Sequence, residues 1–215
     1  MAPLSSPFLL LHFTGQPSGG LVPTSPKPRA PGPAAYASLH REPTARVSRL
    51  RTALLSRRTP AGGFGYEFPV VTRWGSYDEG EPNLVATTFA LQGLTDAAQM
   101  AADAEAASDG LELARFTLDH FGAHTRFLAY HPGSTVLVHN ANILACGQIA
   151  RTYRAARSEP PDEVYDAARL TLAAQRPDGA WPYAEHPRCG GVDTFHTLYL
   201  LDVLDQPARA DARGQ

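Results

Sequence analysis

The fold is decided by a stretch that occurs twice, first as Glu112-Leu-Ala-Arg-Phe-Thr-Leu118 and, 54 residues later, as Asp166-Ala-Ala-Arg-Leu-Thr-Leu172. Alanine, arginine, threonine and leucine recur in register between the two copies. The match extends outward, because the same shift lays Phe127 on Trp181 and Asn142 on His196. A fixed period of this length indicates helical hairpins that bury their apolar faces against one another.

Each repeat contains two different kinds of helix. The first kind is apolar on nearly every side, over residues 84–98, 141–156 and 194–204, which predicts burial on several sides. The second kind is amphipathic, over residues 111–121 and 162–175. A double-layered closed ring explains this alternation better than an open solenoid, which would leave more apolar surface in water. The predicted fold is therefore all-α: a partial α/α toroid of about three helical hairpins within residues 61–206.

The composition changes sharply before the repeats begin. Residues 1–60 hold eight basic residues, one acidic residue and ten of the nineteen prolines, whereas residues 61–215 hold eleven basic and twenty acidic residues. Such a proline-rich segment cannot bury enough apolar surface to offset its ordering entropy. Residues 1–60 and 207–215 are therefore predicted to be disordered. The arginines between Arg46 and Arg58 lack interleaved aromatic residues, so a solvated helix or linker is favoured over a nucleic-acid or anionic-membrane patch.

Charge and cysteine content exclude several classes of protein. The net charge of -2 argues against a dedicated nucleic-acid binder. No apolar run approaches the roughly 18 to 20 residues that a membrane span needs. Cys146 and Cys189 are isolated in the sequence, which predicts two reduced thiols and a cytoplasmic protein.

Four strings of sequence together resemble one family of proteins. They are Trp74-Gly-Ser-Tyr-Asp-Glu-Gly-Glu-Pro-Asn-Leu-Val-Ala-Thr-Thr-Phe89, Val138-His-Asn-Ala-Asn-Ile-Leu144, Gln175-Arg-Pro-Asp-Gly-Ala-Trp-Pro-Tyr-Ala-Glu185 and Val192-Asp-Thr-Phe-His-Thr-Leu-Tyr199. Over residues 61–206 the chain resembles the bacterial α/α-toroid proteins, the class shared by terpenoid cyclases, protein prenyltransferases and six-hairpin glycosidases. Within that class it looks most like the VpsJ-type proteins of polysaccharide biosynthesis.

The resemblance implies both a function and a shortfall. It implies a central cavity that takes a saccharide or saccharide-linked substrate in a bacterial polysaccharide pathway, with general acid/base chemistry if the protein is an enzyme. It also implies a ring of about six hairpins, of which this chain supplies about half. We therefore expect that the chain is truncated or its start misassigned, or that two copies form a homodimer that completes the ring.

The candidate site follows from where such a ring places its loops. The loops that enter the first helices gather around one mouth of the cavity, and here they are rich in carboxylates, histidines and aromatic residues. Asp193 and His196 lie three apart on one helix, so they can share a hydrogen bond that makes the imidazole a better base. The predicted catalytic residues are Asp193, His196, Glu185 and Glu81. The predicted substrate-binding residues are Trp74, Tyr77, Asn83, Thr88, Tyr130, His139, Asn140, Asn142, Trp181 and Tyr183.

Structural interpretations of the same residues stay open. Asp193, Asn83 and Asn140 each precede a predicted helix closely and suit N-caps. His196 suits a core histidine, and the aromatic residues suit packing. Asn142 is harder to explain as packing, because a buried amide needs several hydrogen-bond partners.

Other chemistries have weaker support in the sequence. Zinc chemistry would recruit His131, His139, His186, His196 and Cys189, but no HExxH or CxxC spacing occurs. Terpenoid cyclisation would need an Asp-rich string, and none is found. We predict no metal and no cofactor. The sequence leaves open whether the protein is a carbohydrate-active enzyme or a non-catalytic binding or scaffold protein.

Overall fold

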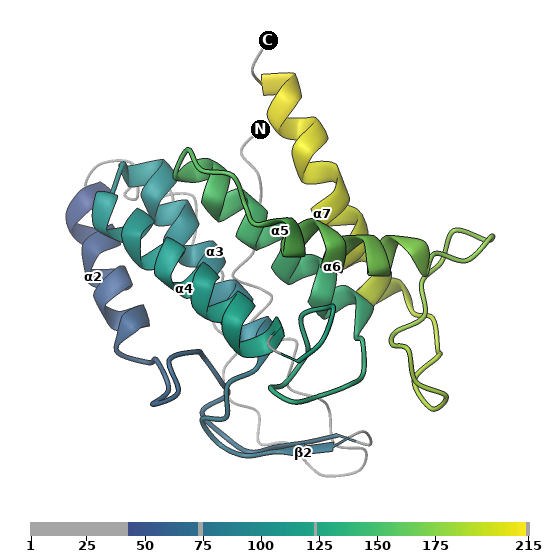
Figure 1. Ribbon diagram of the computed structural model, residues 1–215. Coiled ribbons are helices and arrows are strands. Elements are labelled where there is room, and N and C mark those ends of the chain that lie inside the picture. The colour runs from purple at the N-terminus through teal and green to yellow at the C-terminus, as the bar shows by residue number, and fades with distance from the viewer. Residues whose placement is uncertain (1–42, 73–74, 123, 214–215) are drawn as a thin grey trace, which may run out of the picture.

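The computed structural model describes residues 43–72, 75–122 and 124–213 (Figure 1). Its helices are α2 (Pro43–Leu55), α3 (Leu84–Ala101), α4 (Ala104–Gly122), α5 (His139–Ala155), α6 (Asp162–Ala173) and α7 (Thr194–Arg213). The only strands in this part of the chain, β1 (Val70–Thr72) and β2 (Gly75–Tyr77), pair antiparallel. The prediction of a mainly helical protein is confirmed.

The repeat predicted from the sequence is visible in where the apolar helices begin. Helices α3, α5 and α7 start at residues 84, 139 and 194, each 55 residues after the one before. Helix α4 packs against α3, and α6 packs against α5. The turn between α3 and α4 uses a left-handed Ala102 and then Asp103, whose Oδ1 accepts the backbone N–H groups of Glu105 and Ala106 at 3.0 Å. Two packed helix pairs are therefore followed by α7.

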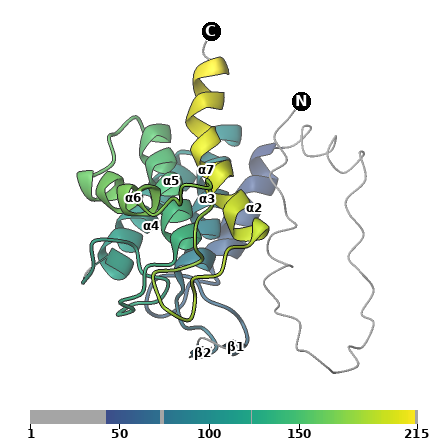
Figure 2. The same cartoon turned by 90° about the vertical axis from the view of Figure 1, so that its right-hand side faces the viewer.

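Helix α5 is the most enclosed element. It packs against α3, α4, α6 and α7, and Figure 2 shows α4 and α6 on one side of α5 and α7 on the other. Its core contacts involve fully buried side chains such as Leu91, Leu113 and Ile149. Helices α2 and α7 do not pack extensively against each other, so the described helices form an open array. The closed toroid stays a prediction.

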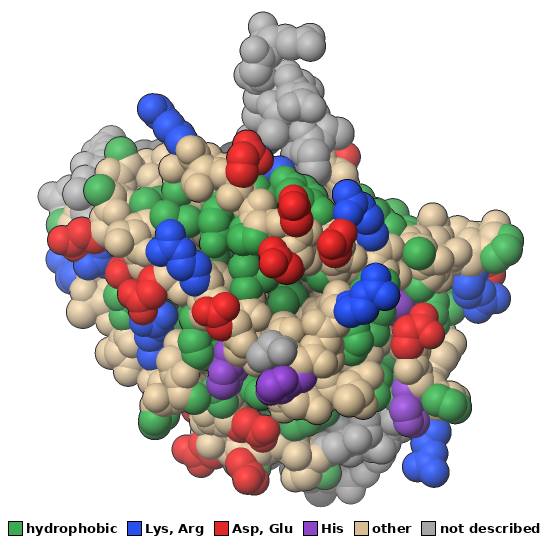
Figure 3. Space-filling view, viewed as in Figure 1, with side chains coloured by type: hydrophobic (Ala, Val, Ile, Leu, Met, Phe, Trp, Pro, Cys, Tyr) green, Lys and Arg blue, Asp and Glu red, His purple; other side chains and the backbone are tan. Residues whose placement is uncertain are grey.

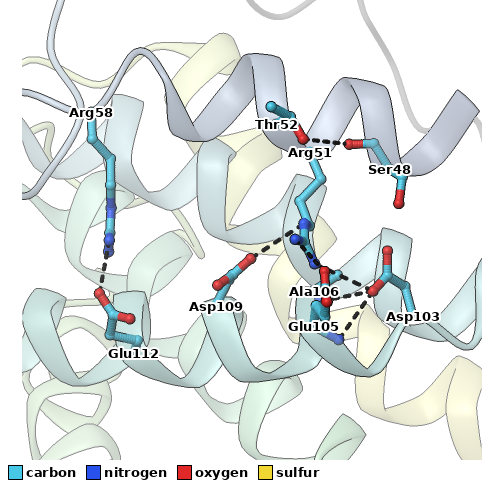
Figure 4. Close-up of polar contacts among 9 residues, drawn as sticks. All are labelled: Ser48, Arg51, Thr52, Arg58, Asp103, Glu105, Ala106, Asp109 and Glu112. Carbon is cyan, nitrogen blue, oxygen red and sulfur yellow. Dashed lines mark hydrogen bonds and ion pairs between the residues drawn. The ribbon is translucent and has the colours of Figure 1, made fainter.

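Residues 43–55, which were predicted to belong to a disordered tail, form helix α2. Leu54 and Leu55 pack against the core cluster. The guanidinium of Arg51 meets three carboxylates at the start of α4, with N to O distances of 3.5 Å to Asp103, 2.5 Å to Glu105 and 3.5 Å to Asp109 (Figure 4). Arg51 in the basic stretch is thus held by carboxylates at the start of α4, about 50 residues away in the sequence. The residues around Arg51 give no indication of these partners.

The remaining boundary predictions have mixed outcomes. Residues 207–213, predicted to be disordered, continue α7; they are rich in alanine and arginine, which have high helix propensity. The predicted tail before residue 43 lies outside the described residues, as does its counterpart at 214–215. No helix in the described ranges is both long and apolar enough to cross a bilayer.

Of the three predicted N-caps, Asn83 and Asp193 are confirmed and Asn140 is wrong. Asn83 caps α3, because its Oδ1 accepts the N–H of Ala86 at 2.8 Å. Asn140 lies inside α5, whose cap is Val138 without a side-chain hydrogen bond. Helix α5 starts at His139, earlier than predicted. The N–H of His139, which has no acceptor within its own helix, donates to the carbonyl of Tyr183 at 3.1 Å, and this bond stabilises the earlier start.

Two helical glycines should respond in opposite ways to replacement by alanine. A Cβ atom at Gly147 in α5 would collide with Cγ1 of Val203, a stiff β-branched residue that is itself buried. At Gly93 in α3 the nearest atom is Leu54 Cδ2 at 3.7 Å, an ordinary contact. Gly147→Ala should therefore lower the free energy of unfolding by about 1 kcal/mol or more, because overpacking outweighs the gain in helix propensity. Gly93→Ala should raise it by up to about 1 kcal/mol. Urea denaturation of both variants tests the pair, and a stabilised Gly147→Ala protein would contradict the α5–α7 packing.

Candidate functional site

Backbone hydrogen bonds hold the loops together at the N-terminal ends of α3 and α5. The N–H of Leu84, the first residue of α3, donates to the carbonyl of Tyr130 at 3.0 Å. One repeat later the N–H of His139, the first residue of α5, donates to the carbonyl of Tyr183 at 3.1 Å. Each apolar helix is therefore attached to the aromatic loop of the following repeat. The loops gather at one end of the helices, as the sequence predicted.

A cavity of about 310 Å³ lies between these loops. Its walls include Tyr77, Tyr130 and Tyr183, which are spaced 53 residues apart and thus occupy equivalent places in successive repeats. Its other polar wall residues include His131, His186 and Cys189. We call this cavity the tyrosine pocket. All three tyrosines were predicted to bind substrate, and the structure brings them to one cavity.

His131 is the residue in the tyrosine pocket that most needs a partner. It is 8% exposed, and neither of its ring nitrogens makes a hydrogen bond of good geometry among the described residues, although the Pro82 carbonyl lies near enough to act on its pKa. Its ring stacks on Tyr77 with centroids 3.7 Å apart, and Nδ1 lies 3.9 Å from Glu81 Oε1, beyond hydrogen-bond distance. Burial lowers its pKa to about 4, although Glu81 and the Pro82 backbone oppose the shift. A neutral imidazole at pH 7 can both donate and accept a hydrogen bond from a ligand.

The tyrosine hydroxyls are neutral as well. Burial raises the pKa of Tyr130, whose hydroxyl bonds to that of Tyr66, and it raises the pKa of Tyr183 to about 12. His131, which lines the pocket, was missed as a binding residue by the sequence prediction. A signal for His131 existed, because it directly follows the periodic Tyr130, but burial without a partner has no signature in sequence.

The predicted carboxylates each lie close to a histidine. Glu185 Oε1 lies 3.0 Å from His139 Nε2, and Asp193 Oδ2 lies 2.5 Å from His196 Nδ1. Glu81 is the carboxylate beside His131. The sequence predicted only the Asp193 pairing, from its three-residue spacing. These pairs fix how the imidazoles are oriented, which is the usual support for a general base.

Asp193 combines the two interpretations that its sequence left open. Its Oδ1 accepts the backbone N–H of His196 at 2.8 Å, as an N-cap does, while Oδ2 bonds to the ring of the same residue. Partial burial by itself raises the pKa of Asp193. The hydrogen bonds from the His196 backbone and ring lower that pKa by more, so the net shift is downward. The His196 ring contacts Tyr183 edge-on with centroids 4.6 Å apart. The pair thus borders the tyrosine pocket behind Tyr183 without lining it.

The carboxylates predicted to be catalytic do not line the tyrosine pocket. No carboxylate lines the described tyrosine pocket; its polar lining is hydroxyl, imidazole, thiol and guanidinium. Glu81, Glu185 and Asp193 contact histidines instead. Spacing in the sequence identifies loop carboxylates but not which way the loop turns them.

Several predicted binding residues have structural roles. Asn142 is fully buried: its Oδ1 accepts the N–H of Leu128 at 2.9 Å, and its amide donates to the carbonyl of Ala167 and the hydroxyl of Thr171 at 2.8 and 2.9 Å. The Thr88 hydroxyl donates to the carbonyl of Leu84 within its own helix. The polar atoms of these two side chains are engaged inside the protein, and their predicted substrate contacts stay a prediction.

The other predicted residues divide between packing and open positions. Trp181 is buried and donates to the carbonyl of Thr171 at 2.9 Å, so it packs rather than offers a stacking face. Asn83 is buried in its capping role. Asn140 is 5% exposed, and its Oδ1 has no partner among the described residues. Trp74 lies outside the described residues.

Two further features of the described residues bear on where a site can lie. No group of three or more histidine, cysteine, aspartate or glutamate residues in the described ranges is placed to hold a metal ion. A larger cavity, about 620 Å³, lies between the end of α4 and the start of α6. Its lining includes Asp119, Arg126 and Glu163 but none of the predicted residues, and Figure 3 shows charges of both signs scattered over this face. We place the site at the smaller cavity, because the buried His131 imidazole and the periodic tyrosines converge there.

Comparison of the chain with protein families, with curated proteins and with solved structures finds no significant match. The resemblance to α/α-toroid proteins therefore rests on the strings quoted above.

The burial of His131 predicts how stability depends on pH. The unfolded chain binds a proton at this imidazole near pH 6.5, whereas the folded protein does so only near pH 4. Stability should therefore fall as the pH falls through this window, since protons favour the unfolded state. His131→Gln should remove this contribution, on the order of 3 kcal/mol at most between pH 7 and pH 4. Urea unfolding at several pH values measures the free energy of unfolding of both proteins. If that free energy changed with pH by the same amount in wild type and in His131→Gln, the attribution of this pH dependence to His131 would be wrong.

Proposed function

We propose that this protein binds a saccharide or saccharide-linked small molecule in the tyrosine pocket. The observation that carries the proposal is the buried His131 imidazole, whose nitrogens make no hydrogen bond of good geometry among the described residues, beside three tyrosines. A polyhydroxylated ligand offers donors and acceptors to such an imidazole, and its apolar ring faces pack on aromatic side chains. The cavity volume of about 310 Å³ fits a ligand of one or two sugar rings. The family resemblance adds the expectation of a bacterial polysaccharide pathway.

If the bound ligand is also transformed, the histidine–carboxylate pairs supply acid/base chemistry. Asp193 and His196 border the pocket behind Tyr183, and Glu185 holds His139. A carboxylate partner stabilises the imidazolium that forms when the histidine takes a proton. This chemistry differs from the two-carboxylate mechanism of most glycosidases, because no carboxylate lines the described cavity.

The binding proposal predicts a different outcome for two tyrosines. A thermal-shift screen of mono- and oligosaccharides should identify a ligand, and calorimetry then gives its affinity. Tyr183→Ala should weaken binding by about tenfold or more, equivalent to about 1.4 kcal/mol, because it removes a pocket wall and a hydroxyl. Tyr165→Ala, on the exposed face of α6, should leave the affinity unchanged. A screen without any ligand, or equal losses in both variants, would count against the proposal.

A scaffold or assembly role is the second candidate, and one observation favours it. Helix α7 exposes Phe195, Leu198, Leu201 and Leu204 to 40%, 57%, 48% and 38%. The two equivalent helices, α3 and α5, are each covered by an amphipathic helix, whereas α7 packs extensively only on α5 within the described residues. We infer that a second copy of the chain covers α7, which agrees with the homodimer expected from half a ring.

The dimer proposal is tested by mass in solution. Light scattering at micromolar concentration should give twice the chain mass for the wild-type protein. A Leu198→Glu, Leu201→Glu double variant should be monomeric, because it puts charges into the proposed interface. Leu50→Glu changes a leucine of α2 that is 58% exposed and should keep the dimer. A monomeric wild-type protein would eliminate this candidate.

A further inference from the structure

Cys189 and His186 form a thiol–imidazole pair in the wall of the tyrosine pocket. Cys189 Sγ lies 3.8 Å from His186 Nδ1, within hydrogen-bond range for sulfur. The backbone N–H of Arg188 donates to the same Nδ1 at 3.2 Å. Accepting that bond requires a lone pair at Nδ1, so the proton of the neutral ring is at Nε2. The acceptor nitrogen of His186 therefore faces the thiol.

The two cysteines of the chain have contrasting surroundings. Cys189 is 8% exposed and lines a cavity, together with the titratable or charged residues Tyr77, His131, Tyr183, His186 and Arg188. Cys146 is 2% exposed within α5 and contacts Asn142, and burial raises its pKa to about 12. A buried thiol without a base is chemically inert, whereas a thiol beside an acceptor imidazole can lose its proton. Cys146 is therefore an internal reference for the reactivity of Cys189.

The same cavity shows independently that it is built for a polar ligand. His131, across the pocket wall from the loop of Cys189, is nine-tenths buried, and neither ring nitrogen makes a hydrogen bond of good geometry in the described structure. A buried polar group without a partner costs stability unless a ligand completes it. The thiol and this imidazole line one cavity, so a ligand held by His131 lies near the thiol.

We propose that Cys189 is a nucleophile that accepts an acyl group from an ester or thioester bound in the tyrosine pocket, with His186 as its base. The proposal shares the pocket of the proposed function but does not depend on a saccharide ligand. Acyl transfer is favoured over thiol redox chemistry, because it needs no oxidant and no second thiol.

The step balances with the groups present. The thiol proton moves to His186 Nδ1, which gives up its hydrogen bond from the Arg188 N–H, as Sγ bonds to the acyl carbon, and the carbonyl π pair moves to oxygen. When that pair returns, the bond from carbon to the leaving oxygen or sulfur breaks, and the leaving group takes the proton from His186. The products are a thioester at Cys189 and a neutral alcohol or thiol.

Alkylation of the native full-length protein tests the nucleophile. Iodoacetamide at pH 7, followed by peptide mass spectrometry, should modify Cys189 and leave Cys146 unmodified. His186→Gln should slow modification of Cys189 at least about tenfold at pH 7, since the base is lost. The two proteins should react at similar rates at pH 9.5, where hydroxide removes the thiol proton. His124→Gln, an exposed histidine outside the pocket, is the matched control and should react like wild type.

Acylation tests the substrate class. Incubation with p-nitrophenyl acetate should place an acetyl group on Cys189, with nitrophenolate release that is lost in Cys189→Ala. Circular dichroism of each variant shows whether it is folded. Equal alkylation rates for His186→Gln and wild type at pH 7, or a Cys189 that reacts only after denaturation, would overturn the base and the nucleophile. Acetylation at other residues alone would overturn the acyl assignment, while loss of saccharide binding without loss of labelling would affect only the proposed function.

Discussion

The buried amide of Asn142 holds three separate parts of the chain in one arrangement. From the first turn of α5 it reaches the backbone of Leu128, the carbonyl of Ala167 and the hydroxyl of Thr171. An unsatisfied amide or peptide group in this place would cost free energy, so α5, α6 and the loop that leads to Tyr130 must keep their relative positions. The tyrosine pocket inherits this constraint, because Tyr130 follows Leu128 by two residues. The hydrogen bonds of Asn142 thus position a pocket that Asn142 does not line.

The pocket is a product of the repeat rather than of any single loop. The carbonyls of Tyr130 and Tyr183 cap the starts of α3 and α5 in the same way, so each tyrosine is held by the helix of the preceding repeat. Tyr77, Tyr130 and Tyr183 therefore reach one cavity from three successive repeats. What distinguishes the repeats is the residue beside each tyrosine, and that is where His131 and the loop of His186 and Cys189 contribute polar groups.

The sequence predicted the elements well and the directions of side chains poorly. Amphipathic periodicity located α4 and α6, because a 3.6-residue pattern reports burial of one helix face directly, and apolar stretches without a polar face located α3, α5 and α7. Neither pattern located α2 as an ordered part of the bundle, since Arg51 depends on carboxylates distant in sequence. In the site, the tyrosines were predictable from their spacing. The roles of His131, Asn142 and the carboxylates were not, because hydrogen-bond partners depend on loop paths that no spacing encodes.

The attachment of α7 through one neighbour gives the molecule uneven local stability. Helix α5 is enclosed by four helices, whereas among the described helices α7 packs extensively only on α5, where Gly147 leaves room for Val203. Helix α7 therefore opens at a lower free energy than α5, and its amide protons exchange with solvent before those of α5. Because the His196 ring lies against Tyr183, fraying of the first turn of α7 removes one support of the pocket wall. Ligand occupancy and the order of α7 are thereby linked: whatever fills the pocket slows the exchange of that turn.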